Sequence, residues 1–167
     1  MNRSFTKYYC LFITFIAMGE VFCEPLNVGE KAPSISLIRL ENKEYFKSLE
    51  LIGEKNLVLC FFSSWDKSFI NTLPELIEIS NDFHEHSEFI LVSVREKKPL
   101  IKDFVSKKNI SLQVAMDKFG KTFKKFGGNK TPLMIVINKR GFITYKLETF
   151  NAGYEIELVE HLKLKLD

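Results

Sequence analysis

The fold is decided by residues 56–76, which read NLVLCFFSSWDKSFINTLPEL. The first eight of these, residues 56–63, are apolar almost throughout, which is typical of a strand that is covered on both faces. Residues 68–84 carry apolar side chains at helical spacing, and Pro74 predicts a bend in the first third of this helix. A buried strand followed directly by an amphipathic helix indicates a layered α/β domain, and we expect residues 56–63 to form its central strand.

Strands and helices alternate along the rest of the chain. Residues 34–40 and 45–51 alternate apolar and polar side chains on either side of a short polar turn, which predicts an N-terminal β-hairpin with one solvated face. The other predicted strands are 89–94, 112–116, 133–138 and 142–147, and the other predicted helices are 100–107, 118–126 and one that begins near Tyr154. We expect that last helix to place four side chains against the sheet: Ile156, Val159, Leu162 and Leu166.

The composition is that of one globular domain. Of the 167 residues, 46% are hydrophobic and 27% are charged, with only eight Gly and five Pro, which disfavours disorder, collagen and repeat arrays. Lys and Arg number 24 against 21 Asp and Glu, and the two signs are interleaved, so we expect no nucleic-acid partner. Three cysteines at uneven spacing fit neither a disulfide framework nor a Cys-x-x-Cys motif.

Residues 1–23 have the pattern of a secretory signal. Arg3 and Lys7 precede an uncharged run at residues 8–18, and Gly19-Glu20 ends that run. A run of 11 residues is too short for a bilayer span, which needs about 20 apolar residues. The alternative is an uncleaved amphipathic N-terminus or a buried helix. We expect an export signal at residues 1–23 and a protein located in the periplasm or cell envelope.

The end of this segment leaves two outcomes open. Cleavage between Cys23 and Glu24 would release the folded domain, whereas lipid attachment at Cys23 would make residues 1–23 a lipoprotein signal and tether the domain to a membrane. We expect no other membrane contact. In both cases residues 24–167 form the folded domain, and Cys60 is its only free thiol because Cys10 leaves with the signal.

Residues 61–76 resemble the thioredoxin superfamily, specifically its exported TlpA/ResA-like branch and the related alkyl hydroperoxide reductase/thiol-specific antioxidant domains. Those proteins read Phe-Trp-Ala-Thr-Trp-Cys-x-x-Cys and then Pro-Glu-Leu, whereas this chain reads FFSSW at 61–65 and LPEL at 73–76. Further motifs match in the family's order: VGEKAP at 28–33, Asp117 with Gly120, Phe126-Gly127, and Pro132 followed by INKRG at 137–141. The resemblance implies a thioredoxin-like three-layer α/β fold with a central mixed sheet, flanking helices and the N-terminal hairpin.

The resemblance places the family's two redox cysteines at Asp66 and Phe69. The family's chemistry needs a thiolate at the start of a helix and a resolving thiol three residues later. Neither Asp66 nor Phe69 can form a bond to sulfur, so the resemblance implies a degenerate redox site with no catalytic residue. We expect Asp66 or Ser68 to cap the helix, and a contact between Asp66 and a partner or ligand is the alternative.

The same resemblance implies a binding groove. In the family, the ring at Trp65 shapes a substrate-facing groove, and Pro132 stands at the cis-proline position, where the preceding residue offers its backbone to an extended chain. The alternatives are that Trp65 is an ordinary packing residue and that Pro132 serves only to build the fold. The predicted groove residues are Trp65, Asp66, Ser68, Thr131 and Pro132.

Cys60 lies in the predicted central strand, where we expect it to act as a small buried apolar residue. A peroxidase or redox sensor that uses this single thiol is the alternative. His84 and His86 have no third ligand placed by the sequence, so we expect neither a metal nor another cofactor. The lysine pairs 97–98, 107–108 and 124–125 are typical of solvated faces.

The leading hypothesis is an exported thioredoxin-fold protein that lacks the redox dithiol and binds a protein or peptide. Its partners would be extended envelope polypeptides or a redox-active relative, with an accessory role in the cell envelope. The rival hypothesis is a thiol-disulfide oxidoreductase or peroxiredoxin-like antioxidant enzyme of the TlpA/ResA kind, with Cys60 as its only thiol. Enzymatic activity therefore stays open, although the degenerate redox site disfavours it.

Overall fold

The computed structural model describes residues 26–163. The strands are β1 (Ser36–Arg39), β2 (Tyr45–Lys47), β3 (Asn56–Phe62), β4 (Ser87–Val94), β5 (Gln113–Asp117), β6 (Leu133–Ile137) and β7 (Ile143–Leu147). The helices are α1 (Lys67–Asp82), α2 (Lys98–Lys107), α3 (Lys121–Lys125) and α4 (Tyr154–Lys163), with a 3₁₀ turn, η1 (Ser48–Leu51). The strands form one sheet in the order β2-β1-β5-β4-β3-β6-β7.

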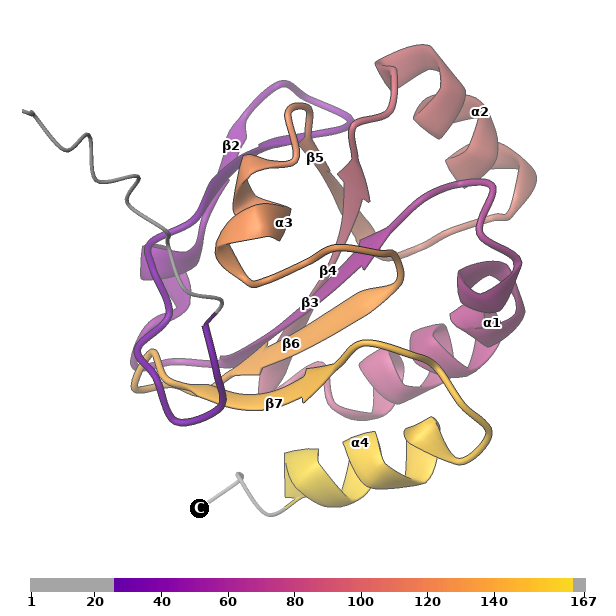
Figure 1. Cartoon of the computed structure of the whole chain (residues 1–167). Coiled ribbons are helices and arrows are strands. Elements are labelled where there is room, and N and C mark those ends of the chain that lie inside the picture. The colour runs from indigo at the N-terminus through magenta and orange to yellow at the C-terminus, as the bar shows by residue number, and fades with distance from the viewer. Residues whose placement is uncertain (1–25, 164–167) are drawn as a thin grey trace, which may run out of the picture.

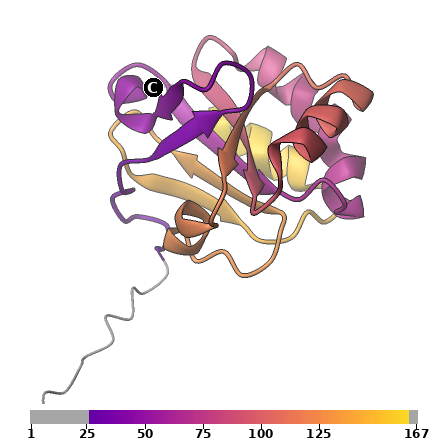
Figure 2. The same ribbon diagram turned by 90° about the horizontal axis from the view of Figure 1, so that it is seen from above.

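The sheet is mixed and has helices on both faces, as the sequence predicts. β3, β4 and β5 are parallel, whereas β6 and β7 continue the sheet antiparallel on one side and the β1–β2 hairpin joins it antiparallel through β5 on the other. Because successive parallel strands are joined by right-handed crossovers, α1 and α2 lie on the same face. Figures 1 and 2 show α1, α2 and α4 on that face and α3 on the opposite one.

All seven residues of β3 are buried, because both faces of this strand are covered. Val58, Cys60 and Phe62 belong to the core under α1, α2 and α4. The alternate residues of the strand pack toward α3 and the N-terminal segment. The prediction of a strand buried on both faces is confirmed, but the middle position of the sheet belongs to β4. The reason is that the hairpin adds two strands beyond β5.

Two predicted boundaries are wrong. The second hairpin strand was expected at 45–51, but β2 ends at Lys47 and η1 follows. There Ser48 still bonds to Ile35, whose N–H donates to the Ser48 hydroxyl, as the chain enters η1. The helix expected at 118–126 begins only at Lys121, because Gly120 adopts a left-handed conformation with φ of 67°.

The buried face of α4 differs from the predicted one. Tyr154, Leu158 and Leu162, spaced four residues apart, are the buried residues of this helix, whereas Ile156 is 61% exposed. Val159 packs at the edge of the core as expected. The side chain of Leu166 lies outside the described residues.

The predicted signal segment at residues 1–23, with Cys10 and Cys23, also lies outside the described residues. Within residues 26–163, no helix is long and apolar enough to cross a bilayer. Pro74 lies inside α1, which continues on both sides of it, and the predicted bend there stays a prediction.

Candidate functional site

The candidate site lies at one end of the sheet. The chain leaves the parallel strands β3, β4 and β5 at this end and enters the antiparallel strand β6 there. The loop after β3 carries Trp65 and Asp66, the loop after β4 carries Glu96, and the residues before β6 are Thr131 and Pro132. Loops at the carboxyl ends of parallel strands are the usual place for binding groups in open α/β sheets.

Asp66 is the N-cap of α1. Its Oδ1 accepts hydrogen bonds from the backbone N–H groups of Ser68 (2.9 Å) and Phe69 (3.4 Å). The carboxylate therefore satisfies free donors of the first helical turn and complements the helix dipole, which stabilises a helix by about 1 kcal/mol. Of the two predicted capping residues, Asp66 holds this role, at the position of the family's first cysteine.

Phe69, at the position of the family's second cysteine, lies in the core. Its side chain is fully buried, and its ring stacks on Phe62 with ring centroids 4.5 Å apart. Phe104 from α2 lies 6.5 Å from it. The second redox position is therefore filled by a packing residue and does not face the groove.

Thr131 connects β6 to the loop after β3. The Thr131–Pro132 peptide bond is cis. The Thr131 hydroxyl lies 3.1 Å from Ser63 Oγ and 3.3 Å from Asp66 Oδ2, so its single proton can be donated to one of them at a time. The backbone N–H and C=O of Thr131 form no hydrogen bond with another backbone group of residues 26–163.

Glu96, in the loop after β4, holds the loop after β3. Its carboxylate accepts from the Ser64 backbone N–H (3.0 and 3.2 Å) and from the Ser64 hydroxyl (2.6 Å). The Ser93 hydroxyl donates to it over 3.1 Å. The sequence analysis missed Glu96, and the available signal was its place two residues after the end of a buried strand.

Trp65 is 73% exposed and is the only tryptophan of the chain. It follows the Ser63-Ser64 segment and precedes the capping residue Asp66, whose carboxylate reaches Thr131. Most of the Trp65 ring is therefore available to a ligand. The five predicted groove residues all belong to the two segments that meet here.

Cys60 faces away from this site. It is 1% exposed, and its side chain belongs to the core under α1 and α4. Burial raises the pKa of its thiol above the ordinary value of 9.0, which disfavours the reactive thiolate. The native packing thus holds this thiol in the form that reacts least.

No cluster of three or more His, Cys, Asp or Glu residues in the described part of the chain could hold a metal ion. The His84 ring instead lies at the end of α1, with Nδ1 2.7 Å from the carbonyl oxygen of Asn81.

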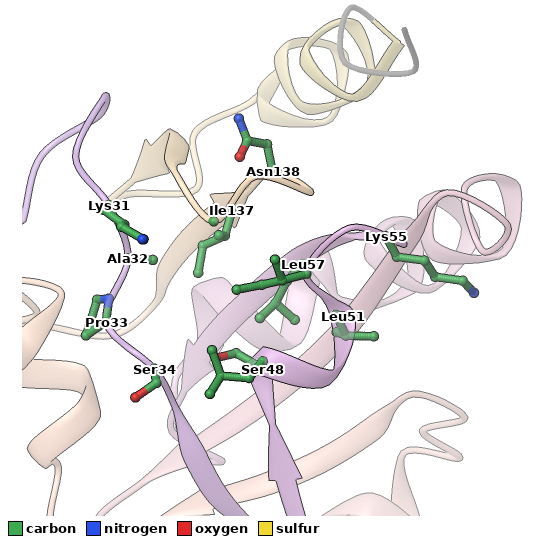
Figure 3. Close-up of a pocket in the computed structure, with 13 residues that line it drawn as sticks. Lys31, Ala32, Pro33, Ser34, Ser48, Leu51, Lys55, Leu57, Ile137 and Asn138 are labelled. Carbon is green, nitrogen blue, oxygen red and sulfur yellow. The ribbon is translucent and has the colours of Figure 1, made fainter.

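A separate pocket of about 380 Å³ lies at the opposite end of the sheet (Figure 3). Leu57 from β3 and Ile137 from β6, which are register partners, lie between the 31–34 segment and η1. Lys31 and Lys55 lie at its edge. Because Leu57 is near the start of β3, this pocket is separated from Trp65 by the length of that strand.

Comparison with known proteins finds redox proteins that resemble this chain. Thiol-disulfide oxidoreductase ResA of Bacillus thuringiensis subsp. konkukian (strain 97-27) is 26% identical over 141 residues, which cover 84% of this chain and 79% of that protein. A thioredoxin-family thiol:disulfide interchange protein from Chlorobium tepidum TLS superposes with a TM-score of 0.70 at 20% identity, covering 85% of this chain and 99% of the other.

A secreted Mycobacterium tuberculosis disulfide oxidoreductase homologous to E. coli DsbE superposes with a TM-score of 0.67 at 19% identity, covering 78% of this chain and 95% of the other. At such identities the likeness shows the thioredoxin-like fold alone. The model of the AhpC/TSA family matches residues 28–146, from the segment before β1 into β7. The chain therefore belongs to the AhpC/TSA family.

Proposed function

We propose that this protein binds an extended polypeptide in the groove formed by Trp65, Asp66, Ser68, Thr131 and Pro132, and that it does so without the dithiol chemistry of its relatives. The observation that carries the proposal is the exposed ring of Trp65 next to Asp66, whose carboxylate reaches Thr131, a residue whose backbone has no hydrogen bond to another backbone group of residues 26–163. An extended peptide gains affinity from main-chain hydrogen bonds, and side-chain contacts supply its specificity.

The occupants of the two redox positions support binding over disulfide exchange. Exchange needs a thiolate that attacks a disulfide sulfur and a second thiol that resolves the product. Asp66 instead caps α1 through Oδ1, and Phe69 is buried against Phe62. The start of α1 therefore carries the fixed carboxylate of Asp66 next to the ring of Trp65, and both can contact a peptide.

Binding is tested by fluorescence anisotropy with labelled short peptides that contain no cysteine. We expect the Trp65→Ala/Thr131→Arg variant to bind at least about tenfold more weakly, because it removes the exposed ring and places a larger side chain at position 131. Since Thr131 is buried, the single Trp65→Ala variant separates lost binding from lost folding. Phe142→Ala/Thr149→Arg makes the same two chemical changes away from the groove and should bind like the wild type. Equal affinity of the wild type and both Trp65 variants would remove the groove from the proposal.

The names of the relatives favour the second candidate, a thiol-disulfide oxidoreductase or a peroxiredoxin-like enzyme. Cys60 is the only cysteine within residues 26–163, so this activity requires an opening of the core around β3. Insulin reduction and peroxide consumption by the purified protein test it, with Cys60→Ser as the control. Activity that disappears in Cys60→Ser would support the enzyme, whereas no activity, or the same activity in both proteins, would exclude Cys60 as the redox group.

We also propose that the protein is exported and acts in the cell envelope on extended polypeptides or on a redox-active relative. The support is the charged start, short apolar run and polar break within residues 1–23. Mass spectrometry of the native protein should find Glu24 or a lipid-modified Cys23 at its N-terminus. An intact Met1 would contradict cleavage and lipid attachment alike.

A further inference from the structure

A second concave surface lies beside the peptide groove, at the same end of the sheet. It encloses about 640 Å³ between the β1–β2 turn, the segment from β4 into α2, and the residues after β5. We call it the basic groove, because five cationic side chains line it: Lys43, Arg95, Lys97, Lys98 and Lys118. Glu96 is the only acidic residue among those that line it.

The cations of the basic groove have no carboxylate partner. The ion pairs within residues 26–163 involve Lys47, Lys107 and Lys146, and none of these lines the groove. The Glu96 carboxylate is directed to Ser64 and Ser93 instead. Five positive charges against one negative charge leave the groove at +4, so it favours a negatively charged occupant.

The start of α2 adds to this preference. Lys97 is the N-cap residue of α2, and its side chain makes no capping hydrogen bond. The free N–H groups and the dipole of a ten-residue helix therefore point toward an anion at this place. Lys97 and Lys98 lie at the same helix end, so their positive charges and the free N–H groups of α2 act together on an anion.

The floor of the basic groove is apolar. This favours an anion that also carries aliphatic atoms over an anion that carries charge alone. Ile38 from β1 is 38% exposed and pairs in register with the half-buried Met116 of β5, and Pro99 lies nearby. An acidic peptide can place its aliphatic atoms on this floor and its carboxylates against the lysines, whereas free phosphate would use only the charges. A flat lipid surface would not reach the floor of a concave groove.

Glu96 links the basic groove to the segment that carries the peptide groove. Glu96 lines the former and bonds to Ser64, the neighbour of Trp65. From β6 the sheet runs through β3 and β4 to β5, which is three steps of about 4.8 Å, or about 15 Å. An extended chain covers that distance with about four or five residues.

We propose that the polypeptide bound at Trp65 and Thr131 is acidic. Its carboxylates lie in the basic groove, about four or five residues along the polypeptide from the part bound at Trp65 and Thr131. This inference rests on the proposed function, because it assigns the charge of the same bound polypeptide.

The test compares three cysteine-free peptides of equal length: one with a Glu cluster at one end, one with Gln in place of each Glu, and one with Lys. Anisotropy of the labelled peptide measures affinity, and the fluorescence of Trp65, the only tryptophan, reports contact at the peptide groove. Lys97→Glu/Lys98→Glu reverses two groove charges. Lys107→Glu/Lys108→Glu makes the same change at the other end of α2, about 15 Å away, where only an exposed ion pair to Asp103 is lost.

We expect the Glu peptide to bind about tenfold more tightly than the Gln peptide at low salt, with the difference shrinking as salt is added. Lys97→Glu/Lys98→Glu should remove that difference, and Lys107→Glu/Lys108→Glu should keep it. Equal affinity for the Glu and Gln peptides, or equal loss in both variants, would overturn the inference.

Two further outcomes separate the inference from the proposed function. Trp65-dependent binding of the Gln peptide with no gain from Glu would leave the proposed function standing and refute the acidic preference. Failure of all three peptides would refute both. Phosphatidylglycerol vesicles test the lipid alternative: vesicle binding that is lost in Lys97→Glu/Lys98→Glu and is not displaced by the Glu peptide would overturn the inference.

Discussion

Asp66 combines a capping role at the start of α1 with a contact to the strand-entry residue Thr131. A carboxylate at the start of α1 accepts two backbone N–H groups, so the helix keeps a negative group at its N-terminus. The carboxylate has no bond-forming reaction with sulfur. Its second oxygen is instead within hydrogen-bonding reach of Thr131, which ties the helix start to the residue before the cis-proline.

The capping role predicts a specific pair of stability changes. Asp66→Ala removes both acceptors and should lower the free energy of unfolding by about 1 kcal/mol, within a range of about 0.5–2. Asp66→Asn keeps an oxygen for the Ser68 N–H and should lose less than half as much, since only the charge is removed. Urea denaturation measures both. Equal losses in the two variants would mean that charge, and not the hydrogen bonds, supports the helix start.

The sequence predicted those site residues whose role follows from their position in a single motif. Asp66 and Thr131 could be located because the family resemblance places one at a helix start and the other before the cis-proline position. Glu96 could not, because its role depends on Ser64, which is 32 residues away in the chain and 3.0 Å away in space. Its place two residues after a buried strand marks Glu96 as a loop residue at that end of the sheet, but it does not show which loop the carboxylate holds.

Aromatic contacts join α1, α2 and β3 at the level of elements. Phe62, Phe69 and Phe104 come from β3, α1 and α2 and form a stacked cluster within the main core. A cysteine at position 69 would leave much of this volume empty. The Phe69 ring therefore couples the start of α1 to the packing of α2.

Truncation of this cluster should be costly. Phe69→Ala is expected to lower the free energy of unfolding by about 3–5 kcal/mol, because it removes a fully buried ring and leaves a cavity. Phe119→Ala is the matched control, since this ring is 68% exposed, and we expect a change within about 0.5 kcal/mol. Chemical denaturation measures both variants. A loss below about 1 kcal/mol for Phe69→Ala would show that the three elements do not depend on this ring.

Element types could be predicted from hydrophobic periodicity, whereas several boundaries and faces could not. The expected helix at 118–126 fails at its start because the side chain of Asp117 accepts from the N–H groups of Lys121 and Phe123, which places the first turn after Gly120. The predicted face of α4 is wrong only at Ile156, because the helix turns instead to bury Tyr154, whose hydroxyl donates to the carbonyl of Thr72 on α1. Both contacts are tertiary or involve side chains, so apolar spacing alone does not show them.

At the scale of the whole molecule, the sheet topology gathers the functional groups at one end. Lys43, Arg95 and Lys118 lie far apart in sequence and come together because β1, β4 and β5 are neighbours. In the sequence the pair 97–98 looks like any other pair of surface lysines. The basic groove therefore depends on the order of the strands in the sheet, and the sequence alone does not show it.

The attachment of α4 and the burial of β3 predict how the whole fold responds to alkaline pH. Burial, with a hydrogen bond to Glu157 and its negative charge, raises the pKa of Tyr145 from 10.0 to about 12. Burial, together with the charge of Glu75, raises the pKa of Tyr154, and burial alone raises that of the Cys60 thiol. In all three groups the native state favours the protonated form.

The sign of the effect follows from proton binding. The unfolded chain loses the Cys60 proton near pH 9.0 and the tyrosine protons near pH 10.0, whereas the native protein keeps them to higher pH. The unfolded state then binds fewer protons, so the free energy of unfolding should fall as pH rises above about 9. The slope approaches about 1.4 kcal/mol per pH unit for each fully buried group and is smaller for the half-buried Tyr145.

Urea denaturation at a series of pH values from about 8 to about 12 tests this expectation. Tyr154→Phe/Cys60→Ala should be less stable at pH 8, because it loses the hydrogen bond to Thr72 and some core volume, but its stability should decline less steeply above about pH 9. Tyr45→Phe is the matched control, because this ring is 55% exposed, and its curve should follow the wild type. Parallel curves for the wild type and Tyr154→Phe/Cys60→Ala would mean that the buried thiol and hydroxyl do not determine alkaline unfolding, and that the fold opens at this pH through other groups.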